Sequence, residues 1–300
     1  MNTPAPTLLV TGASGHLGRA AVRHLLDTLQ VPPARIVATS RTPDALADLA
    51  ARGVTVRAAD FDRPDTLPAA FAGVDRLLLV STDALLEPGK RLAQHRAAIP
   101  AAIDAGVKHV VYTSLPSPAT SHVSFAPDHL GTEQALAASP LGWTVLRNAW
   151  YFENLAHALP GALASGTWAT AAGAGRIAYI ARDDLARAAA VALASGEAGN
   201  RVLTLTGAQA YSVHDIAARV SALTGKPLAV ADLAPEQLLE GLRAHGVPPV
   251  LAEVFASFDA ATAAGDLGEV TDDYARLTGQ PPTTLDAWLP ANIGLLTQAP

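Results

Sequence analysis

The sequence contains no cysteine, which excludes disulfide bonds, thiolate metal sites, iron–sulfur clusters and cysteine nucleophiles. Aromatic residues make up only 5% and charged residues only 16% of the 300 residues, whereas 50% are apolar. This apolar share is ample for a large buried core, and the length suits one α/β unit with a satellite lobe. The composition therefore predicts a globular protein without thiol chemistry.

An excess of positive charge is also missing. The net charge is −6 and there is no basic run, which argues against binding to nucleic acid or to an anionic membrane surface. No stretch of about eighteen apolar residues occurs, and the N-terminus lacks the charged start and apolar core of a signal peptide. These patterns predict a cytoplasmic protein.

Three evenly spaced glycines follow the first apolar run of the chain. The run Thr7–Val10 leads into Gly12, Gly15 and Gly18, after which apolar residues recur at helical spacing. Strand, glycine turn and helix in this order form a phosphate site, because bare backbone approaches the pyrophosphate and free helix N–H groups bind the anion. The spacing G-x-x-G-x-x-G is not the G-x-G-x-x-G of dinucleotide dehydrogenases. A glycine turn without a ligand is the alternative, and we favour nucleotide binding.

No acid stands about twenty residues beyond the loop, where an NAD-specific protein binds the ribose 2′-hydroxyl. The second predicted strand, ARIVATSR, ends instead on Thr39, Ser40 and Arg41. A planar guanidinium can hold a 2′-phosphate through two hydrogen bonds and stack on adenine. Arg41 therefore predicts a preference for NADPH over NADH, the alternative being an ordinary surface arginine.

Further strands are predicted from the segments VTVRAADFD, RLLLVST, KHVVYTSL and WTVLRN, which alternate with helical patterns. Parallel strands joined by right-handed helical crossovers form one doubly wound sheet, whose ligand lies across the carboxyl ends of the strands. Polar residues at those ends are site candidates, namely Ser81, Ser114 and Asn148. Hydroxyls that only satisfy local backbone are the alternative for the two serines.

Aromatic residues cluster directly after the last of these strands, in AWYFEN. We interpret Phe152 as part of the core. Trp150 and Tyr151, just past the carboxyl end of a strand, are better placed to form the wall of a pocket. Asn154 belongs to the same cluster.

The regular alternation loosens further along the chain, as expected of a second lobe. Residues 177–180 (IAYI) are predicted as a short strand, RVLTLTG as a strand that returns to the main sheet, and Ser212 as a helix cap. The α/β class is thus a Rossmann doubly wound parallel sheet with a smaller C-terminal α/β substrate lobe. We expect the Rossmann domain to comprise residues 1–155 and 183–227, and the substrate lobe 156–182 and 228–300.

Several motifs together resemble one family: TGASGHLG, SR after the second strand, AADFD, AAIDAGVKHVVYTS, HLGTEQAL, LRNAWYFEN and ARDDLA. They are similar to the NmrA-like branch of the atypical short-chain dehydrogenases/reductases. The nearest pattern is the type 2 NAD(P)H:quinone oxidoreductases, with triphenylmethane reductase as a relative. The resemblance covers nearly the whole chain and is strongest up to Leu193, and LRNAWYFEN is its most specific part. It implies a Rossmann fold, NADPH and a substrate cleft between two lobes, and it leaves a homodimer open.

The resemblance also implies roles for individual residues. Those that would hold the pyrophosphate are Gly12, Ser14, Gly15, His16, Leu17 and Gly18. The 2′-phosphate would be bound by Arg41, and the adenine bordered by Asp60 and Phe61. Ser81, Ser114 and Asn148 would lie towards the nicotinamide and its ribose. The slot for the substrate would be formed by Trp150, Tyr151 and Asn154.

The Tyr-x-x-x-Lys pair of conventional short-chain dehydrogenases is absent. The only lysines are Lys90, Lys108 and Lys226, and none has a tyrosine four positions earlier. Where the pair would stand, the resemblance places His129 and Glu133. His129 is a candidate for polarising a substrate oxygen, the alternative being a helix-surface or capping histidine.

Two functions fit these features. The first is an NADPH-dependent reductase that transfers hydride to quinones or similar conjugated electrophiles, with NADH a weaker cofactor and with no flavin or metal. The second is an NAD(P)-binding redox-sensing regulator of the NmrA type that does not turn over. A sugar-nucleotide epimerase or dehydratase is disfavoured, because it needs the missing proton-transfer pair.

Overall fold

The computed structural model describes residues 5–297, which form two units, each with its own internal contacts. The first unit comprises the residues up to Leu115, Pro127–Arg147 and Leu185–Leu203. The second comprises Pro116–Ala126, Asn148–Asp184 and the chain from Thr204 onward. Neither unit is one continuous piece of chain.

This division differs from the expected domain boundaries. The chain after Arg147 and the chain after Leu203 belong to the second unit, although residues 148–155 and 204–227 were expected in the Rossmann domain. The reason lies in α8 (Val213–Thr224), which packs on β9 (Ala229–Asp232) and α12 (Leu285–Thr297) of the second unit. The two units are of similar length.

A seven-stranded sheet organises the first unit, with the order β3-β2-β1-β4-β5-β6-β8. Its strands are β1 (Leu8–Val10), β2 (Ile36–Ser40), β3 (Thr55–Ala58), β4 (Arg76–Leu79), β5 (His109–Ser114), β6 (Gly142–Asn148) and β8 (Arg201–Leu205). The pairs from β3 to β6 are parallel. The predicted doubly wound parallel sheet and the return of RVLTL to it are confirmed.

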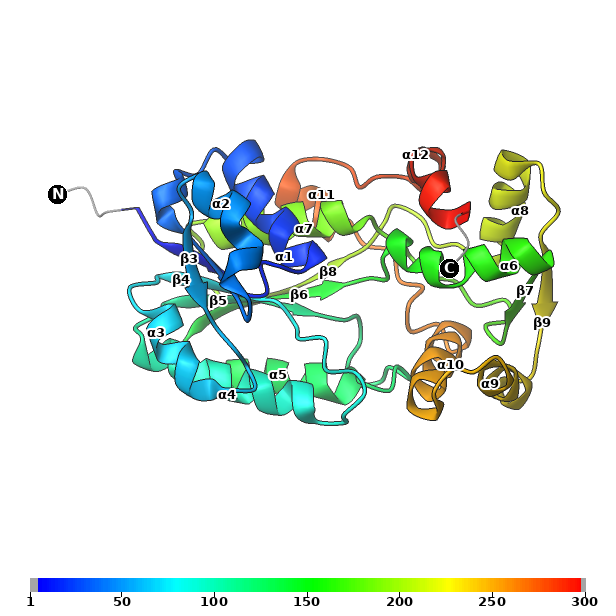
Figure 1. The fold of residues 1–300 in the computed structure, drawn as a ribbon, viewed down its shortest axis with the longest axis horizontal. Coiled ribbons are helices and arrows are strands. Elements are labelled where there is room, and N and C mark those ends of the chain that lie inside the picture. Colours follow the sequence, from blue (N-terminus) through cyan, green and yellow to red (C-terminus); the bar gives the residue numbers. More distant parts are fainter. Residues whose placement is uncertain (1–4, 298–300) are drawn as a thin grey trace. The chain divides into compact units, whose positions relative to one another are not determined.

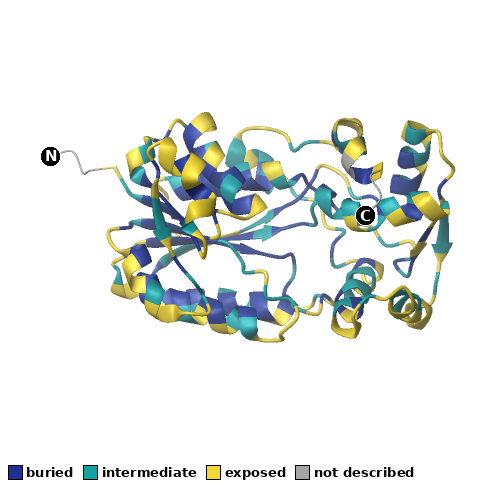
Figure 2. Ribbon diagram, in the orientation of Figure 1, coloured by how far each residue is buried: buried dark blue, intermediate teal, exposed yellow. Residues whose placement is uncertain are grey.

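Helices cover both faces of this sheet (Figure 1), with α1, α2 and α7 on one face and α3, α4 and α5 on the other. Their bounds are α1 (His16–Arg23), α2 (Ala47–Ala51), α3 (Leu67–Phe71), α4 (Lys90–Asp104), α5 (Ala126–Ala137) and α7 (Arg182–Ala194). Short helical turns complete the connections: η1 (His24–Thr28), η2 (Pro33–Arg35), η3 (Pro43–Leu46) and η4 (Pro64–Thr66). Because both faces are covered, β1, β2, β4 and β5 are buried along their length, whereas the edge strand β3 is partly exposed (Figure 2).

The core of the first unit also contains a buried arginine. Arg76, at the start of β4, donates from Nε to the carbonyl of Leu193 (2.8 Å) and from Nη1 to the carbonyl of Glu197 (3.0 Å). These carbonyls lie at and beyond the C-terminal end of α7, where backbone acceptors have no helical partner. Burial lowers the pKa of Arg76. The side chain thereby ties α7 to the sheet.

The second unit contains a two-stranded parallel sheet, in which β7 (Thr167–Thr170) pairs with β9. Its other helices are η5 (Phe152–His157), α6 (Leu159–Ser165), α9 (Pro235–Ala244), α10 (Pro249–Ala263) and α11 (Asp273–Thr278). Ser212 caps α8 in a capping box with Asp215, as predicted.

The strand predicted over residues 177–180 is wrong. Ile177 and Ile180 form isolated bridges to Tyr211 and Tyr151, and no continuous ladder develops between them. The apolar run there reflects burial of an irregular segment, since Ile177, Tyr179 and Ile180 are all buried. No helix among residues 5–297 has both the length and the apolar character needed to span a lipid bilayer.

Candidate functional site

The candidate cofactor residues stand in a row along the carboxyl edge of the main sheet. The glycine loop follows β1, which lies between β2 and β4 in the sheet order. From the β3 edge inward, the residues at or just after the strand ends are Asp60 after β3, Arg41 after β2, the loop after β1, Ser81 after β4, Ser114 on β5 and Asn148 on β6. This is the edge at which doubly wound sheets bind their ligands.

Backbone hydrogen bonds fix the glycine loop to both neighbouring strands. The amide of Thr11 donates to the carbonyl of Leu78 on β4 (3.0 Å), and the amide of Ala13 donates to the carbonyl of Thr39 on β2 (2.9 Å). Gly12 has a φ of +58°, a left-handed conformation that glycine adopts without strain. A Cβ atom on Gly18 would stand 2.4 Å from the Gly12 carbonyl oxygen. The loop is therefore rigid, and it depends on two glycines for its own packing.

The N-terminus of α1 suits an anionic group. Its N-cap is Gly15, no side chain caps it by a hydrogen bond, and the first turn holds no acid. Gly15, Ser14 and His16 are exposed, whereas the side chain of Leu17 is buried and leaves only its backbone for a ligand. Backbone N–H groups at a helix start bind phosphate favourably. This part of the chain fits the pyrophosphate role expected for it.

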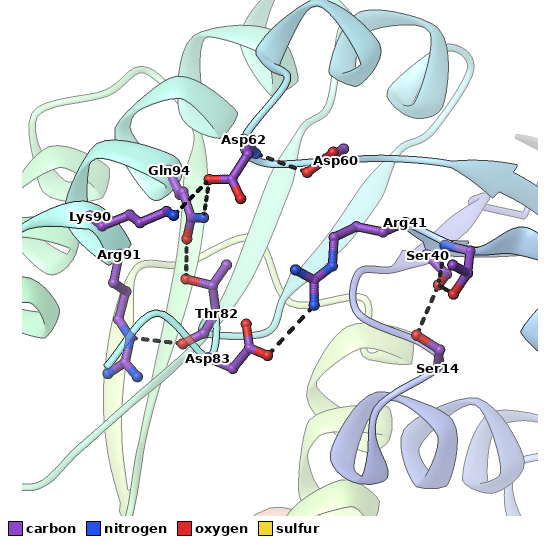
Figure 3. A network of polar contacts seen from close by, with 11 residues as sticks. Ser14, Ser40, Arg41, Asp60, Asp62, Thr82, Asp83, Lys90, Arg91 and Gln94 are labelled. Carbon is purple, nitrogen blue, oxygen red and sulfur yellow. Dashed lines mark hydrogen bonds and ion pairs between the residues drawn. The ribbon is translucent and has the colours of Figure 1, made fainter. Parts of the chain in front are cut away.

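Arg41 extends from the end of β2 over the same edge (Figure 3), and its side chain is 62% exposed. Its Nη2 atom lies 3.6 Å from a carboxylate oxygen of Asp83, in the segment after β4. Next to it, the buried Ser40 donates its hydroxyl to Ser14 Oγ (2.8 Å) and accepts the amide of Thr42 (3.0 Å). The arginine is thus free of core packing and stands beside the glycine loop.

A polar network connects the β3 end with α4 (Figure 3). Gln94 on α4 donates to Asp62 (2.8 Å) and accepts the hydroxyl of Thr82 (2.5 Å). The amide of Asp62 donates to the Asp60 carboxylate (3.0 Å), so Asp60 forms a turn of its own backbone. Phe61 is half-buried and packs against the core of the first unit. The adenine role of Asp60 and Phe61 stays a prediction.

Ser114 belongs to a hydrogen-bonded set at the end of β5. Its hydroxyl donates to Glu133 on α5 (2.6 Å), and Arg147 on β6 binds both carboxylate oxygens of Glu133 at 3.1 and 2.7 Å. The proton of the Ser114 hydroxyl is thereby directed at Glu133, and its lone pairs can accept a hydrogen bond. Ser81 is bound through its amide to the hydroxyl of Thr113 (2.9 Å).

Asn148 is 5% exposed, and neither atom of its side-chain amide has a hydrogen-bond partner within the described residues. Buried amides are normally satisfied, because an unpaired polar group costs about 1–3 kcal/mol. An amide donates and accepts, which is the complement that a carboxamide presents. The residue therefore fits a contact with the nicotinamide.

His129, the candidate for polarising a substrate oxygen, lies in the core of the first unit. His129 is only 4% exposed, and it is also neither a surface nor a capping histidine. Its Nε2 atom accepts from Arg91 Nη1 (2.8 Å), which leaves the proton on Nδ1 to donate to the Tyr112 hydroxyl (2.8 Å). Burial and the Arg91 charge hold the pKa of His129 well below its ordinary value. Both ring nitrogens are engaged inside the core, so the side chain stabilises the first unit.

In the second unit, aromatic side chains that the sequence did not single out surround Trp150. Phe258 on α10 packs edge-on against Trp150 with ring centroids 4.6 Å apart, and both Phe125 and Phe255 lie 6.0 Å from Phe258. All four rings are half-buried. Phe255 and Phe258 are spaced as neighbours on one helix face, which was the available signal. The group Trp150, Phe125, Phe255 and Phe258 is called the aromatic cluster below.

The other two predicted substrate residues lie near the start of η5. Tyr151 is half-buried, and the guanidinium of Arg182 stands 5.4 Å from its ring centroid. Asn154 is half-buried, and its amide donates to the Tyr151 carbonyl (3.0 Å). Phe152 is buried and stacks on Trp288 and Tyr179, as expected for a core residue. Within residues 5–297, no group of three or more histidine, aspartate or glutamate side chains is arranged to hold a metal ion.

Comparison with known proteins shows the family of this chain. The model of the NmrA-like family matches residues 4–289. The chain belongs to the NmrA-like family. The family predicted from the motifs is thereby confirmed.

Relatives within and around the NmrA-like family match over most of their length. Quinone oxidoreductase 2 of Escherichia coli strain K12 is 38% identical over 278 residues, which are 93% of this chain and 96% of the relative. The NAD(P)H azoreductase of Xenophilus azovorans is 32% identical over 279 residues, 92% of this chain and 94% of the relative.

Solved structures show the same fold. That of the NADPH-dependent quinone oxidoreductase of Escherichia coli, complexed with NADPH, has a TM-score of 0.88 and 38% identity, covering 93% of this chain and 97% of the other. That of Citrobacter sp. triphenylmethane reductase, complexed with NADP(H), has a TM-score of 0.87 and 33% identity, covering 93% and 98%. The Rossmann-like fold predicted for this NmrA-like chain is confirmed.

Proposed function

We propose that this protein is an NADPH-dependent reductase of quinones and similar conjugated electrophiles. The observation that carries the proposal is the uncapped, glycine-bounded start of α1 beside Arg41, in a chain without the Tyr-x-x-x-Lys pair. Support comes from relatives whose names include a quinone oxidoreductase and an azoreductase, and from homologous structures bound to NADPH and NADP(H).

Residues at or after the carboxyl ends of the main-sheet strands hold different parts of NADPH. The backbone of the glycine loop and of the first turn of α1 binds the pyrophosphate, and Arg41 binds the 2′-phosphate. Ser114 accepts a hydrogen bond from the nicotinamide ribose, because its own proton is directed at Glu133. Asn148 pairs with the carboxamide. When bound, NADPH supplies a hydride, and no flavin or metal takes part.

A quinone suits a site that lacks a positioned acid. Reduction of a simple ketone leaves a strongly basic alkoxide, for which a general acid is typically worth about 10²- to 10⁴-fold. Reduction of a quinone leaves a phenolate-like oxygen whose conjugate acid has a pKa of about 10, as for tyrosine, so that water can protonate it. This protonation step therefore needs neither His129 nor another histidine in contact with the substrate.

The substrate is held by the aromatic cluster together with Tyr151 and Asn154. A flat conjugated ring stacks favourably on aromatic side chains, in a pocket wall that also excludes water. Asn154 supplies an amide that can hydrogen-bond a substrate oxygen. Direct hydride transfer requires the acceptor ring and the reduced cofactor to be in van der Waals contact.

The purified protein, assayed for NADPH oxidation with a panel of quinones, azo dyes and triphenylmethane dyes, tests the proposal. We expect consumption of NADPH with at least one acceptor, without added flavin. Tight NADPH binding with no turnover on any acceptor would favour the redox-sensing regulator instead. A strict requirement for flavin would contradict direct hydride transfer.

Replacing Arg41 with alanine is expected to weaken NADPH binding by about 1 to 2 kcal/mol, or roughly five- to thirtyfold. The value is set below that of a buried contact, because the Arg41 side chain is 62% exposed and solvent screens it. Calorimetric titration should show little change in NADH affinity. Equal affinities of the unmodified protein for NADPH and NADH would contradict the role of Arg41.

Replacing Trp150 with alanine is expected to raise the KM for quinone about five- to tenfold, the loss expected for one aromatic contact. NADPH affinity should be unchanged, since no candidate cofactor contact is removed. Trp150→Phe is the control, because it keeps a ring against Phe258. An unchanged KM in Trp150→Ala, or an equal loss in Trp150→Phe, would contradict a stacking role.

A further inference from the structure

The ion pair between Arg41 and Asp83 lies across the glycine loop. Arg41 follows β2 and Asp83 follows β4, and these two strands flank β1 in the sheet. Figure 3 shows the guanidinium turned away from Ser40 and towards the Asp83 carboxylate, with 3.6 Å between the nearest nitrogen and oxygen. The carboxylate thus occupies the neighbourhood of the one arginine expected to bind a 2′-phosphate.

The backbone beside Asp83 is held in place by α4. The preceding residue, Thr82, donates its amide to His95 Nε2 (3.2 Å) and its hydroxyl to Gln94 (2.5 Å), and its carbonyl accepts Arg91 Nε (2.8 Å). Gln94, His95 and Arg91 are all buried. The hydrogen bonds at Thr82 therefore hold the backbone that places Asp83 near Arg41.

The neighbouring acids have another partner. Lys90 binds Glu87 (3.0 Å) and lies 3.7 Å from Asp62. Asp83 instead faces Arg41, with the two side chains 82% and 62% exposed. At 3.6 Å the contact is longer than a hydrogen bond, so Asp83 attracts Arg41 without fixing its geometry.

We propose that Asp83 is a cofactor-specificity residue that competes with the 2′-phosphate of NADPH for Arg41. A phosphate dianion and a carboxylate repel each other when they share one cation. Asp83 therefore lowers the affinity for NADPH and leaves the affinity for NADH unaffected. The ratio of the two affinities is smaller as a result. The inference rests on the proposed binding of NADPH at Arg41, and it concerns binding alone.

The test uses two adenosine fragments as probes, adenosine 2′,5′-bisphosphate and 5′-AMP, titrated calorimetrically into the full-length protein. In Asp83→Asn we expect about two- to fivefold tighter binding of the bisphosphate and no change for 5′-AMP, the range of one exposed ion pair. Asp27→Asn is the matched control, since Asp27 is an exposed acid paired with Arg52 in the same unit. It should change neither affinity.

The double variant Arg41→Ala/Asp83→Asn separates competition from a general charge effect. Asp83→Asn should raise the bisphosphate affinity clearly less when Arg41 is already alanine than it does in the unmodified protein. Unchanged or weaker bisphosphate binding in Asp83→Asn, no bisphosphate binding at all, or the same gain in both backgrounds would overturn the proposal. Failure to reduce any quinone would not, because no acceptor is present in this experiment.

Discussion

Gly15→Val should abolish NADPH binding in a protein that remains folded. Gly15 has φ −79° and ψ 167°, which valine adopts freely, and an added Cβ atom would lie 3.3 Å from the Gly12 carbonyl oxygen. The loop can yield by that small amount, whereas the branched side chain would occupy the space of the pyrophosphate. We expect the Kd for NADPH to rise about a hundredfold or more, and the melting temperature to fall by only a few degrees.

Gly18→Ala is the contrasting variant. Its Cβ atom would stand 2.4 Å from the Gly12 carbonyl oxygen and 2.8 Å from the carbonyl carbon, so backbone would have to move. The expected loss is about 2–4 kcal/mol in the free energy of unfolding, measured by urea denaturation. Undiminished NADPH binding in Gly15→Val would refute the phosphate site, and a stable Gly18→Ala protein would refute the close packing of α1 on the loop.

Lowering the pH should destabilise the protein already at pH values well above those at which carboxylates titrate. Burial lowers the pKa of His95 to about 3 and that of His109 to about 4, from an ordinary value of 6.5. For a lowered folded-state pKa, the stabilisation is complete above 6.5 and is lost as pH falls towards the folded value. Between pH 7 and pH 5 each of these two histidines should cost about 2 kcal/mol of unfolding free energy, and His129 adds to the loss in the same direction.

Two aspartates oppose this trend. Burial raises the pKa of Asp128 and of Asp259, so protonation at low pH favours the folded state at these positions. Their effect acts above the ordinary aspartate pKa of 3.8 and opposes that of the histidines.

Urea denaturation at pH 7, 6 and 5 measures this dependence. His109→Gln should reduce the difference between pH 7 and pH 5 by about 2 kcal/mol, because one titrating group is removed. His245→Gln, at an exposed position in the second unit, serves as control and should leave the difference unchanged. A flat stability curve, or equal effects of both variants, would contradict the assignment.

Local patterns predicted the carboxyl edge of the sheet well. The glycine loop and the end of β2 at Ser40 lie where the sequence put them, because turn chemistry and helix period act over a few residues. The predicted topology then placed the remaining candidates, since parallel crossovers bring the carboxyl ends of successive strands to one edge of the sheet. Residues named only as strand ends, such as Ser81 and Ser114, thus came into one row.

Long-range packing was harder to predict. His129 hydrogen-bonds Arg91 and Tyr112, which are 38 and 17 residues away in the chain. No local sequence pattern predicts a histidine with two such buried partners. The same holds for Phe258, whose partner Trp150 is more than a hundred residues away along the chain. The ion pair of Asp83 was not predicted for a related reason, because its partner Arg41 lies on the other side of β1 in the sheet. The sequence records each residue but not which element packs beside it.

Strand β7 pairs in parallel with β9, and the chain between them passes through the first unit, where it adds most of α7 and part of β8. On the ribosome, the first unit therefore lacks α7 until residue 194 has been made, and the second lacks its strand pair until residue 232. The first unit is complete at Leu203, before the second unit is, but two segments of the second unit interrupt its chain. We expect the outer edge of β6, which β8 covers, to stay unpaired until residue 205 has been made, so that nascent chains are candidates for chaperones that shield strand edges.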